Sequence, residues 1–181
     1  MQVNTVFLHG GIQRHVLDLT HELRAFGHEV SVAGGDGGWG IDTRDPLFFP
    51  VPLDRVAAGN GGKLARMAAI LPATLQLRKA IRQSGAELVH AHETAPALIA
   101  KMATIGMNIP IVFTYHASTV ERQGQVAMFA RCCADMTVSP SHTSIDALIS
   151  KGLPRDRTRV LGLGVHPHPE TDQNDVDALR T

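Results

Sequence analysis

Two adjacent glycines, Gly10 and Gly11, stand directly before a run with helical periodicity that ends near Gly27. In that run, large apolar residues recur every three or four positions, as on one face of an amphipathic helix. Glycines at the start of a helix let a ligand approach bare backbone N–H groups at the positive end of the helix dipole. This arrangement suits a phosphate group. The plainer alternative is a turn that needs positive φ angles.

Histidines provide the second kind of candidate chemistry. His116 follows the apolar run 111–115, and a polar residue just past a buried strand lies at the carboxyl edge of a parallel sheet, where open α/β folds bind ligands. His90 and His92 form an H-x-H pair that a strand would place on one face, while Glu93 would point the other way. Two imidazoles on one face raise the question of a metal ion, although a pair supplies only two ligands.

The elements that must position these residues alternate along the chain. Helix-like and strand-like segments follow one another with short turns, which predicts a parallel sheet covered by helices. Expected strands cover residues 29–33, 47–51, 87–92, 111–115, 136–139 and 159–163. Expected helices cover residues 12–26, 63–83, 96–105, 125–134 and 140–150, with Pro72 expected to break or kink the second. We therefore expect an α/β fold with a Rossmann-like, three-layer, doubly wound parallel sheet.

The bulk composition narrows the classes of function. The 17 basic and 17 acidic residues cancel, so net charge gives no support for nucleic-acid binding. Cys132 and Cys133 are adjacent, a poor arrangement for a structural disulfide, which fits a reducing, cytoplasmic compartment. No signal peptide is visible at the N-terminus. Residues 102–120 carry no formal charge, but a glycine, an asparagine and a proline interrupt them, so we reject a membrane span there.

Four segments, collinear along the chain, match one known pattern. They are GGIQRHVLDLTHELRAFGHEV (10–30), ELVHAHE (87–93), PIVFTYH (110–116) and ADMTVSPSHTSIDAL (134–148). Together they resemble the N-terminal, acceptor-side domain of the retaining, nucleotide-sugar-dependent glycosyltransferases of family 4, which have the GT-B fold. The closing RVLGLGVHP (159–167) resembles the strand and turn that lead into the donor-binding domain. The resemblance implies half of a GT-B fold over residues 1–165, followed by a linker and the start of a donor-binding domain over residues 166–181.

Two departures from the family pattern concern the ends of the chain. In the family register, residues 4–9 form the loop before the glycine pair, so only residues 1–3 remain of the first strand, which we expect to be truncated. Without the family, residues 3–8 would themselves be predicted as a strand. The acidic E-x7-E motif and most nucleotide contacts of the family belong to the second domain, which the sequence does not include. The resemblance therefore implies a chain that is inactive alone.

The resemblance also assigns roles to individual residues. Gly10 and Gly11 would meet the donor diphosphate through backbone N–H groups. His116 would lie beside the donor sugar and the reacting centre, either as neutral imidazole or as His⁺. His92 and Glu93 would line the acceptor side of the cleft, while His90 packs inside. The family needs no catalytic metal, so we expect neither a metal ion nor a cofactor beside the nucleoside diphosphate sugar.

Further candidates lie at the acceptor side and on a basic segment. Arg14 and Arg122 are acceptor-side candidates, Arg122 for an anionic acceptor group, and for both the alternative is a solvated surface role. Residues 55–86 contain six basic residues and no acidic one. Such a segment could contact anionic lipids peripherally, at the inner face of the membrane, or form a solvated helix face.

The sequence thus predicts the acceptor-side domain of a hexosyl-type transferase. The implied reaction moves a sugar from a nucleoside diphosphate sugar to a hydroxyl acceptor, with retention at the anomeric carbon. One alternative is a stand-alone module that binds an acceptor or a partner protein, and another is a non-functional gene fragment. A third is a metal hydrolase that uses His90 and His92.

Overall fold

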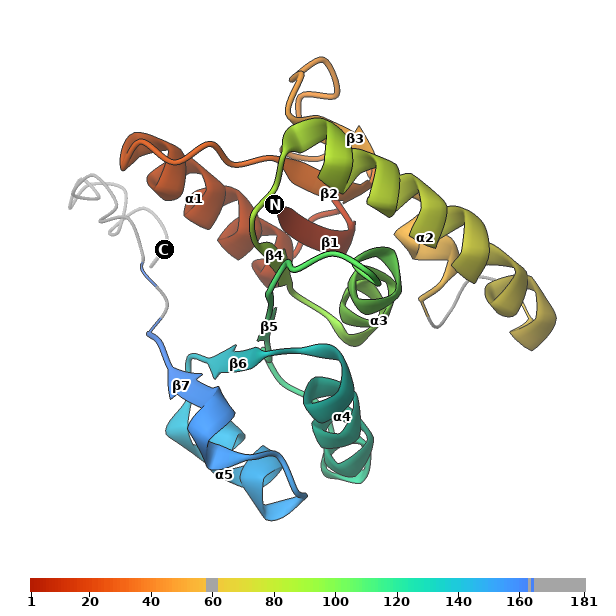
Figure 1. The fold of residues 1–181 in the computed structure, drawn as a ribbon. Helices are drawn as coiled ribbons and strands as arrows, with labels where there is room; N and C mark the ends of the chain where they lie inside the picture. The colour runs from red at the N-terminus through yellow and green to blue at the C-terminus, as the bar shows by residue number, and fades with distance from the viewer. Residues whose placement is uncertain (58–61, 163, 165–181) are drawn as a thin grey trace, which may run out of the picture.

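The computed structural model describes residues 1–57, 62–162 and 164 (Figure 1). The helices in these residues are α1 (Gly11–Ala25), α2 (Lys63–Ser84), α3 (Thr94–Ala103), α4 (Val120–Cys133) and α5 (His142–Ser150), with short 3-10 turns η1 (Leu53–Arg55) and η2 (Arg155–Arg157). The strands are β1 (Gln2–Val6), β2 (Val32–Gly35), β3 (Phe48–Pro50), β4 (Val89–Ala91), β5 (Ile111–Thr114), β6 (Met136–Ser139) and β7 (Thr158–Val160).

The strands of the described residues form one seven-stranded parallel sheet in the order β3-β2-β1-β4-β5-β6-β7. After β3 the chain crosses back to the other side of β1, so the direction of winding reverses between β1 and β4. The expected Rossmann-like, doubly wound α/β fold is confirmed. In such folds the gap at the carboxyl ends of the strands on either side of the reversal is the usual ligand site.

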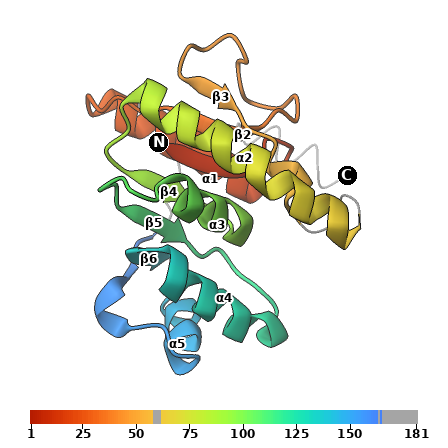
Figure 2. The same cartoon turned by 45° about the vertical axis from the view of Figure 1, so that its right-hand side comes forward.

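Helices cover both faces of this sheet (Figure 2). On one face α1 packs over β1 and β2, where Phe7, Val16, Val32 and Phe48 form a small buried cluster. On the opposite face α2, α3 and α4 lie side by side over the larger core. Successive strand residues supply these two cores in turn, because side chains alternate across a strand. The three layers of the prediction are therefore present.

The first strand is longer than the family register implied. β1 (Gln2–Val6) pairs with β2 on one side and with β4 on the other. The expectation that only residues 1–3 are strand is wrong, and the strand at 3–8 was placed too late. Gln2 and Asn4 are buried although they are polar. This inverted pattern obscured the strand in the sequence, because burial is normally inferred from apolar residues.

Other boundaries moved for local reasons. β2 begins at Val32 rather than at residue 29 and runs into Gly34, where a Cβ would lie 2.5 Å from the Asn4 carbonyl oxygen. α2 runs unbroken through the exposed Pro72, so the expected break is wrong. A proline at an exposed helix position removes one hydrogen bond, and water can satisfy the freed carbonyl group. α5 begins at His142, after the expected residue 140.

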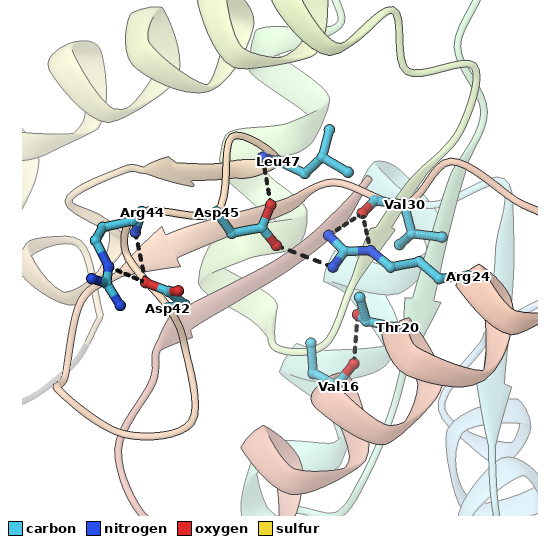
Figure 3. Close-up of polar contacts among 8 residues, drawn as sticks. All are labelled: Val16, Thr20, Arg24, Val30, Asp42, Arg44, Asp45 and Leu47. Carbon is cyan, nitrogen blue, oxygen red and sulfur yellow. Dashed lines mark hydrogen bonds and ion pairs between the residues drawn. The ribbon is translucent and has the colours of Figure 1, made fainter.

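One arginine ties the end of α1 to the segment between β2 and β3 (Figure 3). Arg24 donates through Nε and Nη2 to the Val30 carbonyl oxygen, at 2.9 and 2.7 Å, and through Nη1 to Asp45 Oδ2 at 3.1 Å. The other carboxylate oxygen of Asp45 accepts from the Leu47 N–H at 2.8 Å. These bonds tie the last turn of α1 to the segments that lead into β2 and β3.

Membrane spans were searched in the same described residues. No helix there is both long and apolar enough to cross a bilayer. The uncharged stretch 102–120 forms the end of α3, a turn, β5 and the loop after it, so the rejection of a span is confirmed. The expected linker and start of a donor-binding domain, residues 166–181, lie outside the described residues.

Candidate functional site

The glycine pair lies at the N-terminus of α1, at the carboxyl edge of the sheet. Gly10 is the N-cap residue, with an extended backbone (φ 177°), and neither glycine of the pair has a φ in the left-handed region that favours glycine. The alternative of a turn that requires positive φ is therefore wrong. A Cβ on Gly11 would meet no atom of the described chain within 4 Å, and one on Gly10 would meet only the flexible Gln13 side chain. Neither backbone conformation nor packing explains why both residues are glycine.

The N-terminus of α1 is also open. Among the described residues, no side chain caps it by a hydrogen bond, and its first turn holds no acidic residue. The first N–H groups of a helix have no partner within the helix and carry a partial positive charge. Because Gly10 and Gly11 add no Cβ in front of these groups, an anion can reach them directly.

His116 comes from the end of β5 to the same edge. Its imidazole ring lies 5.5 Å from the ring of His15, in the second turn of α1, and 5.8 Å from the ring of His92 at the end of β4. Its Nε2 atom is buried and has no hydrogen-bond partner in the described chain. A buried ring nitrogen without a partner is an unsatisfied hydrogen-bonding group, and such a group near a ligand-binding edge calls for a functional explanation.

The protonation state of His116 follows from its surroundings. Burial, reinforced by the nearby His15 ring, lowers the pKa of His116 to about 4. At neutral pH the ring is therefore uncharged. Of the two states considered from the sequence, the neutral imidazole is the one that the geometry supports, and the positive charge facing an anion comes from the helix N-terminus.

Two of the four acceptor-side candidates, Glu93 and Arg122, line a groove of about 450 Å³ on the larger-core side of the carboxyl edge. Glu93 is the N-cap residue of α3, and its Oε2 atom accepts a hydrogen bond from the Thr5 N–H at 3.3 Å. The groove lies between α2, α3 and α4, with Val56 from the segment after η1 on its wall.

The groove combines cationic and apolar surfaces. Its apolar walls include Met67, Leu98 and Phe129, and its charged lining residues are Lys63, Arg66, Arg122 and the single carboxylate of Glu93. In the described residues, the side chains of Lys63 and Arg122 form no ion pair. This excess of positive charge beside an apolar wall suits a ligand that has both an anionic group and apolar parts.

The other two acceptor-side candidates lie elsewhere. His92 is only 1% exposed, so the expectation that it lines the cleft is wrong. Its strand places it on the same face as His90, and α1 covers that face. His90 is largely inside, as expected, and its Nε2 atom is 2.6 Å from Thr114 Oγ1. Arg14 is exposed and pairs with Asp18 at 2.9 Å, the helix-surface alternative.

The H-x-H pair does not form a metal centre with its neighbours. In the part of the chain that the structure describes, no group of three or more His, Cys, Asp and Glu side chains is arranged to hold a metal ion. The geometry therefore gives the metal-hydrolase alternative no support.

From the sequence, either His15 or Arg14 could face the cleft, and a role on the helix surface is favoured for both; the structure instead packs His15 against His92 and His116. The signal for this packing was present, because His15 lies three residues after Ile12 and directly before the buried Val16 on the apolar side of the helix. A polar side chain in that position faces the sheet. Its partners on β4 and β5 could not be identified without the topology.

The buried imidazoles make stability dependent on pH. Burial lowers the pKa of His90 to about 4, against about 6.5 in an unfolded chain. Between these values the unfolded chain binds the proton that the folded chain excludes, so stability falls as pH falls. For this group alone, we expect the free energy of unfolding to drop by about 2 kcal/mol between pH 7.5 and pH 5.

Urea unfolding at the two pH values measures this drop. His90→Gln should flatten the dependence by about the same amount, while His28→Gln, at an exposed position after α1, should leave it unchanged. A wild-type stability that does not fall between pH 7.5 and 5, or an equal fall in His90→Gln, would contradict the assignment.

Comparisons with known proteins show the family to which the chain belongs. The profile of Glycosyltransferase Family 4 matches residues 9–168. A phosphatidyl-myo-inositol mannosyltransferase of Propionibacterium freudenreichii is 31% identical over 119 residues, which cover 62% of this chain and 30% of the relative. A GDP-mannose-dependent alpha-mannosyltransferase of Mycobacterium tuberculosis is 25% identical over 181 aligned residues, covering 92% of this chain and 47% of the relative. The chain thus spans less than half the length of these curated relatives.

Solved structures show the same fold. The apo form of WaaB, a lipopolysaccharide outer core galactosyltransferase, matches with a TM-score of 0.67 at 11% identity, over 95% of this chain and 50% of that one. Anabaena HepE, solved in complex with UDP-glucose, matches with a TM-score of 0.65 at 15% identity, over 99% of this chain and 49% of that one.

These neighbours are glycosyltransferases of the GT-B fold, and the described sheet with its helices corresponds to about half of each of their chains. The class that the fold defines is therefore a GT-B-like domain with a Rossmann-like sheet. Because the family profile covers most of the chain, the chain belongs to glycosyltransferase family 4.

Proposed function

We propose that this chain is the N-terminal, acceptor-side domain of a retaining transferase that moves a sugar from a nucleoside diphosphate sugar to a hydroxyl acceptor. The proposal rests on two features at the same edge of the sheet, the uncapped α1 N-terminus behind Gly10 and Gly11 and the ring of His116, which lies 5.5 Å from that of His15 on α1 and has an unpartnered Nε2 atom. Both lie at the edge of the sheet where open α/β folds bind ligands. The complex of HepE with UDP-glucose supports a nucleotide-sugar donor.

The proposed reaction gives each of these groups a task. The bond between the anomeric carbon and the diphosphate oxygen breaks, and its electron pair leaves with the diphosphate. The N–H groups at the start of α1 stabilise the charge that develops there. The acceptor oxygen forms the new bond on the same face of the sugar, and its proton passes to the departing diphosphate. Neutral His116 holds the donor sugar by a hydrogen bond at Nε2. The reaction as proposed uses no metal ion and no further cofactor.

The groove beside Glu93 and Arg122 is the proposed acceptor site. Its cations and apolar walls fit an anionic acceptor that is partly apolar. The relative from Propionibacterium freudenreichii is named for an acceptor of this kind, a phosphatidyl-myo-inositol.

A transfer assay tests the proposal. The protein encoded by the complete gene, supplied with UDP- and GDP-sugars and a lipid extract, should form a product with the anomeric configuration of the donor. The 181-residue chain alone should form none, because a cleft needs both of its walls. Transfer with inversion, or transfer by the chain alone, would contradict the proposal. A complete gene product that binds an acceptor and transfers nothing would favour the alternative of a binding module.

Arg122 should govern acceptor affinity. In Arg122→Gln we expect the KM for the acceptor to rise by about 10-fold or more, because a charge-assisted hydrogen bond is lost, while the KM for the donor stays the same. Steady-state kinetics on the complete gene product measure both values. Arg131→Gln, at an exposed position in the last turn of α4, is the matched control. An unchanged acceptor KM in Arg122→Gln would exclude this role.

A specific observation also favours peripheral membrane contact by α2, at the inner face of the membrane where cytoplasmic nucleotide sugars are available. Four large apolar side chains on this helix are exposed by 58 to 85%, at spacings of three and four residues: Leu64, Met67, Leu71 and Leu75. Farther along the helix, the exposed residues include Lys79 and Arg82, and no acidic residue occurs between 55 and 86. An apolar stripe continued by positive charge fits an anionic lipid surface better than it fits a solvated face.

Vesicle binding tests this contact. We expect the chain to co-sediment with vesicles that contain phosphatidylglycerol, and the double variant Leu64→Gln, Leu71→Gln to bind at least about 10-fold more weakly, since each leucine loses buried apolar area. Phe26→Gln, at an exposed apolar residue that ends α1, should bind like the wild type. Equal binding of the double variant would contradict the contact, as would equal binding to vesicles of phosphatidylcholine alone.

A further inference from the structure

Four imidazole rings pack against one another beneath the candidate site, with His92 at the centre. Its ring lies 4.3 Å from that of His90, 5.7 Å from that of His15 and 5.8 Å from that of His116. The planes of His92 and His116 are nearly parallel, at 28°, whereas His15 meets both rings edge to face. The cluster joins α1, β4 and the end of β5, three elements that meet only in the folded sheet.

The members of the cluster are held to different degrees. His92 Nε2 lies 2.7 Å from Gln2 Oε1, and because that oxygen only accepts, Nε2 carries the proton. His90 is fixed by its contact with Thr114, at 2.6 Å. His116 differs from both, because its buried Nε2 atom has no partner among the described residues. Within the described chain, the contacts with the His15 and His92 rings therefore orient this imidazole.

Burial is the main reason why the cluster stays neutral. For His90, burial is the largest cause of the lowered pKa, followed by the His15 ring, the Met1 α-amino group and the His116 ring. Burial also lowers the pKa of His92 well below its usual value, followed by the effect of the other three rings. For His15 burial lowers the pKa, and Asp18 on the same helix partly opposes this.

Stability alone does not account for this arrangement. His92 Nδ1, like His116 Nε2, is buried without a partner in the described chain, and such an atom costs about 1–3 kcal/mol. An apolar side chain on that face of β4 would avoid the cost. Groups that are unfavourable for stability and gather at a ligand-binding edge point to a functional constraint.

We infer that His92 and His15 are positioning residues, which clamp the His116 ring between a stacked and an edge-on imidazole and so hold its Nε2 atom toward the substrate. The inference rests on the proposed role of His116. The His92 ring, bonded to Gln2 in β1, packs against His116 in the loop after β5. The His15 ring also contacts His116, from the helix whose N-terminus would bind the diphosphate.

NMR titration of the imidazole nitrogens tests the clamp on the 181-residue chain itself, without any need for activity. In the wild type, His116 should stay neutral until the pH falls to about 4. In His92→Asn and in His15→Asn, the ring should move toward solvent, and its titration midpoint should rise by about one pH unit or more. His92→Phe restores a ring in contact with His116 and should keep the midpoint closer to that of the wild type.

His142→Gln, at an exposed residue that starts α5, is the control and should leave the titration of His116 unchanged. If His92→Asn fails to fold, His15→Asn decides the matter, since His15 is only partly buried on a helix surface. A His116 midpoint that is the same in wild type, His92→Asn and His15→Asn would overturn the clamp. Failure of the proposed function would appear separately, as unimpaired sugar transfer in His116→Ala.

Discussion

In the complete gene product, His116→Ala should lower kcat for sugar transfer by about 10²–10³-fold, the usual effect of removing one preorganised hydrogen-bonding group from a reacting centre. The fold should survive the change. His116 lies in the loop after β5, and its Nε2 atom has no hydrogen-bond partner in the described chain. The substitution therefore breaks no hydrogen bond at that atom. We therefore expect the free energy of unfolding to change by no more than about 1 kcal/mol.

Two comparisons make this result specific. His28→Ala, at an exposed histidine after α1, should transfer sugar at the wild-type rate. Protonation of His116 should not reduce the wild-type activity at mildly acidic pH, because the pKa of His116 is about 4. If His116→Ala retained more than about a tenth of the wild-type kcat, His116 could not be the group that holds the donor sugar.

Gly11→Ala should separate folding from function even more clearly. A Cβ at this position meets no atom of the described chain within 4 Å, and alanine is a better helix former than glycine, so the melting temperature should stay the same or rise. The same Cβ would stand between the first N–H groups of α1 and a diphosphate. A displacement of about 1 Å at the reacting centre costs about 10²-fold, and we expect kcat/KM for the donor to fall by that order.

Gly124→Ala is the matched control for this variant. Gly124 lies inside α4, and a Cβ there also meets nothing within 4 Å. It should gain a little stability and keep full activity. If Gly11→Ala were as active as Gly124→Ala, the glycine pair would serve no diphosphate, and the proposed donor site would be wrong.

The sequence predicted the sheet well wherever burial coincided with apolar character. The strand expected at 136–139 has those bounds in β6, and the strand expected at 111–115 differs from β5 by one residue. The Gly27 terminus of the first helix is also confirmed, with a φ of 88° just after α1. Each of these rests on one local signal, either an apolar run or a glycine that a left-handed conformation favours.

The first strand and the unbroken α2 show where local signals fail. Gln2 is buried because its side-chain oxygen accepts from His92, a residue 90 positions away. No window of sequence around residue 2 contains that partner. Likewise, Pro72 is tolerated because it lies on the exposed side of α2, which follows from the packing of α2 and α3 and not from the proline itself.

The candidate site divides in the same way. Gly10, Gly11 and His116 could be selected from the sequence, since a helix start and a strand end both mark the carboxyl edge of a parallel sheet. Which of the acceptor-side candidates line the groove and which are buried could not be predicted from the sequence. Glu93 lines the groove while the adjacent His92 is buried, because one step along the chain changes the face of the sheet on which a side chain lies. Arg122 lines the same groove from α4.

The most direct test of the central claim is a crystal structure of the complete gene product with its nucleoside diphosphate sugar bound. The account predicts diphosphate oxygens within hydrogen-bond distance of the N–H groups at the start of α1, and a sugar hydroxyl within about 3 Å of His116 Nε2. A bound nucleotide sugar that contacts neither α1 nor His116 would contradict the account, and the carboxyl edge of this sheet would then have another function.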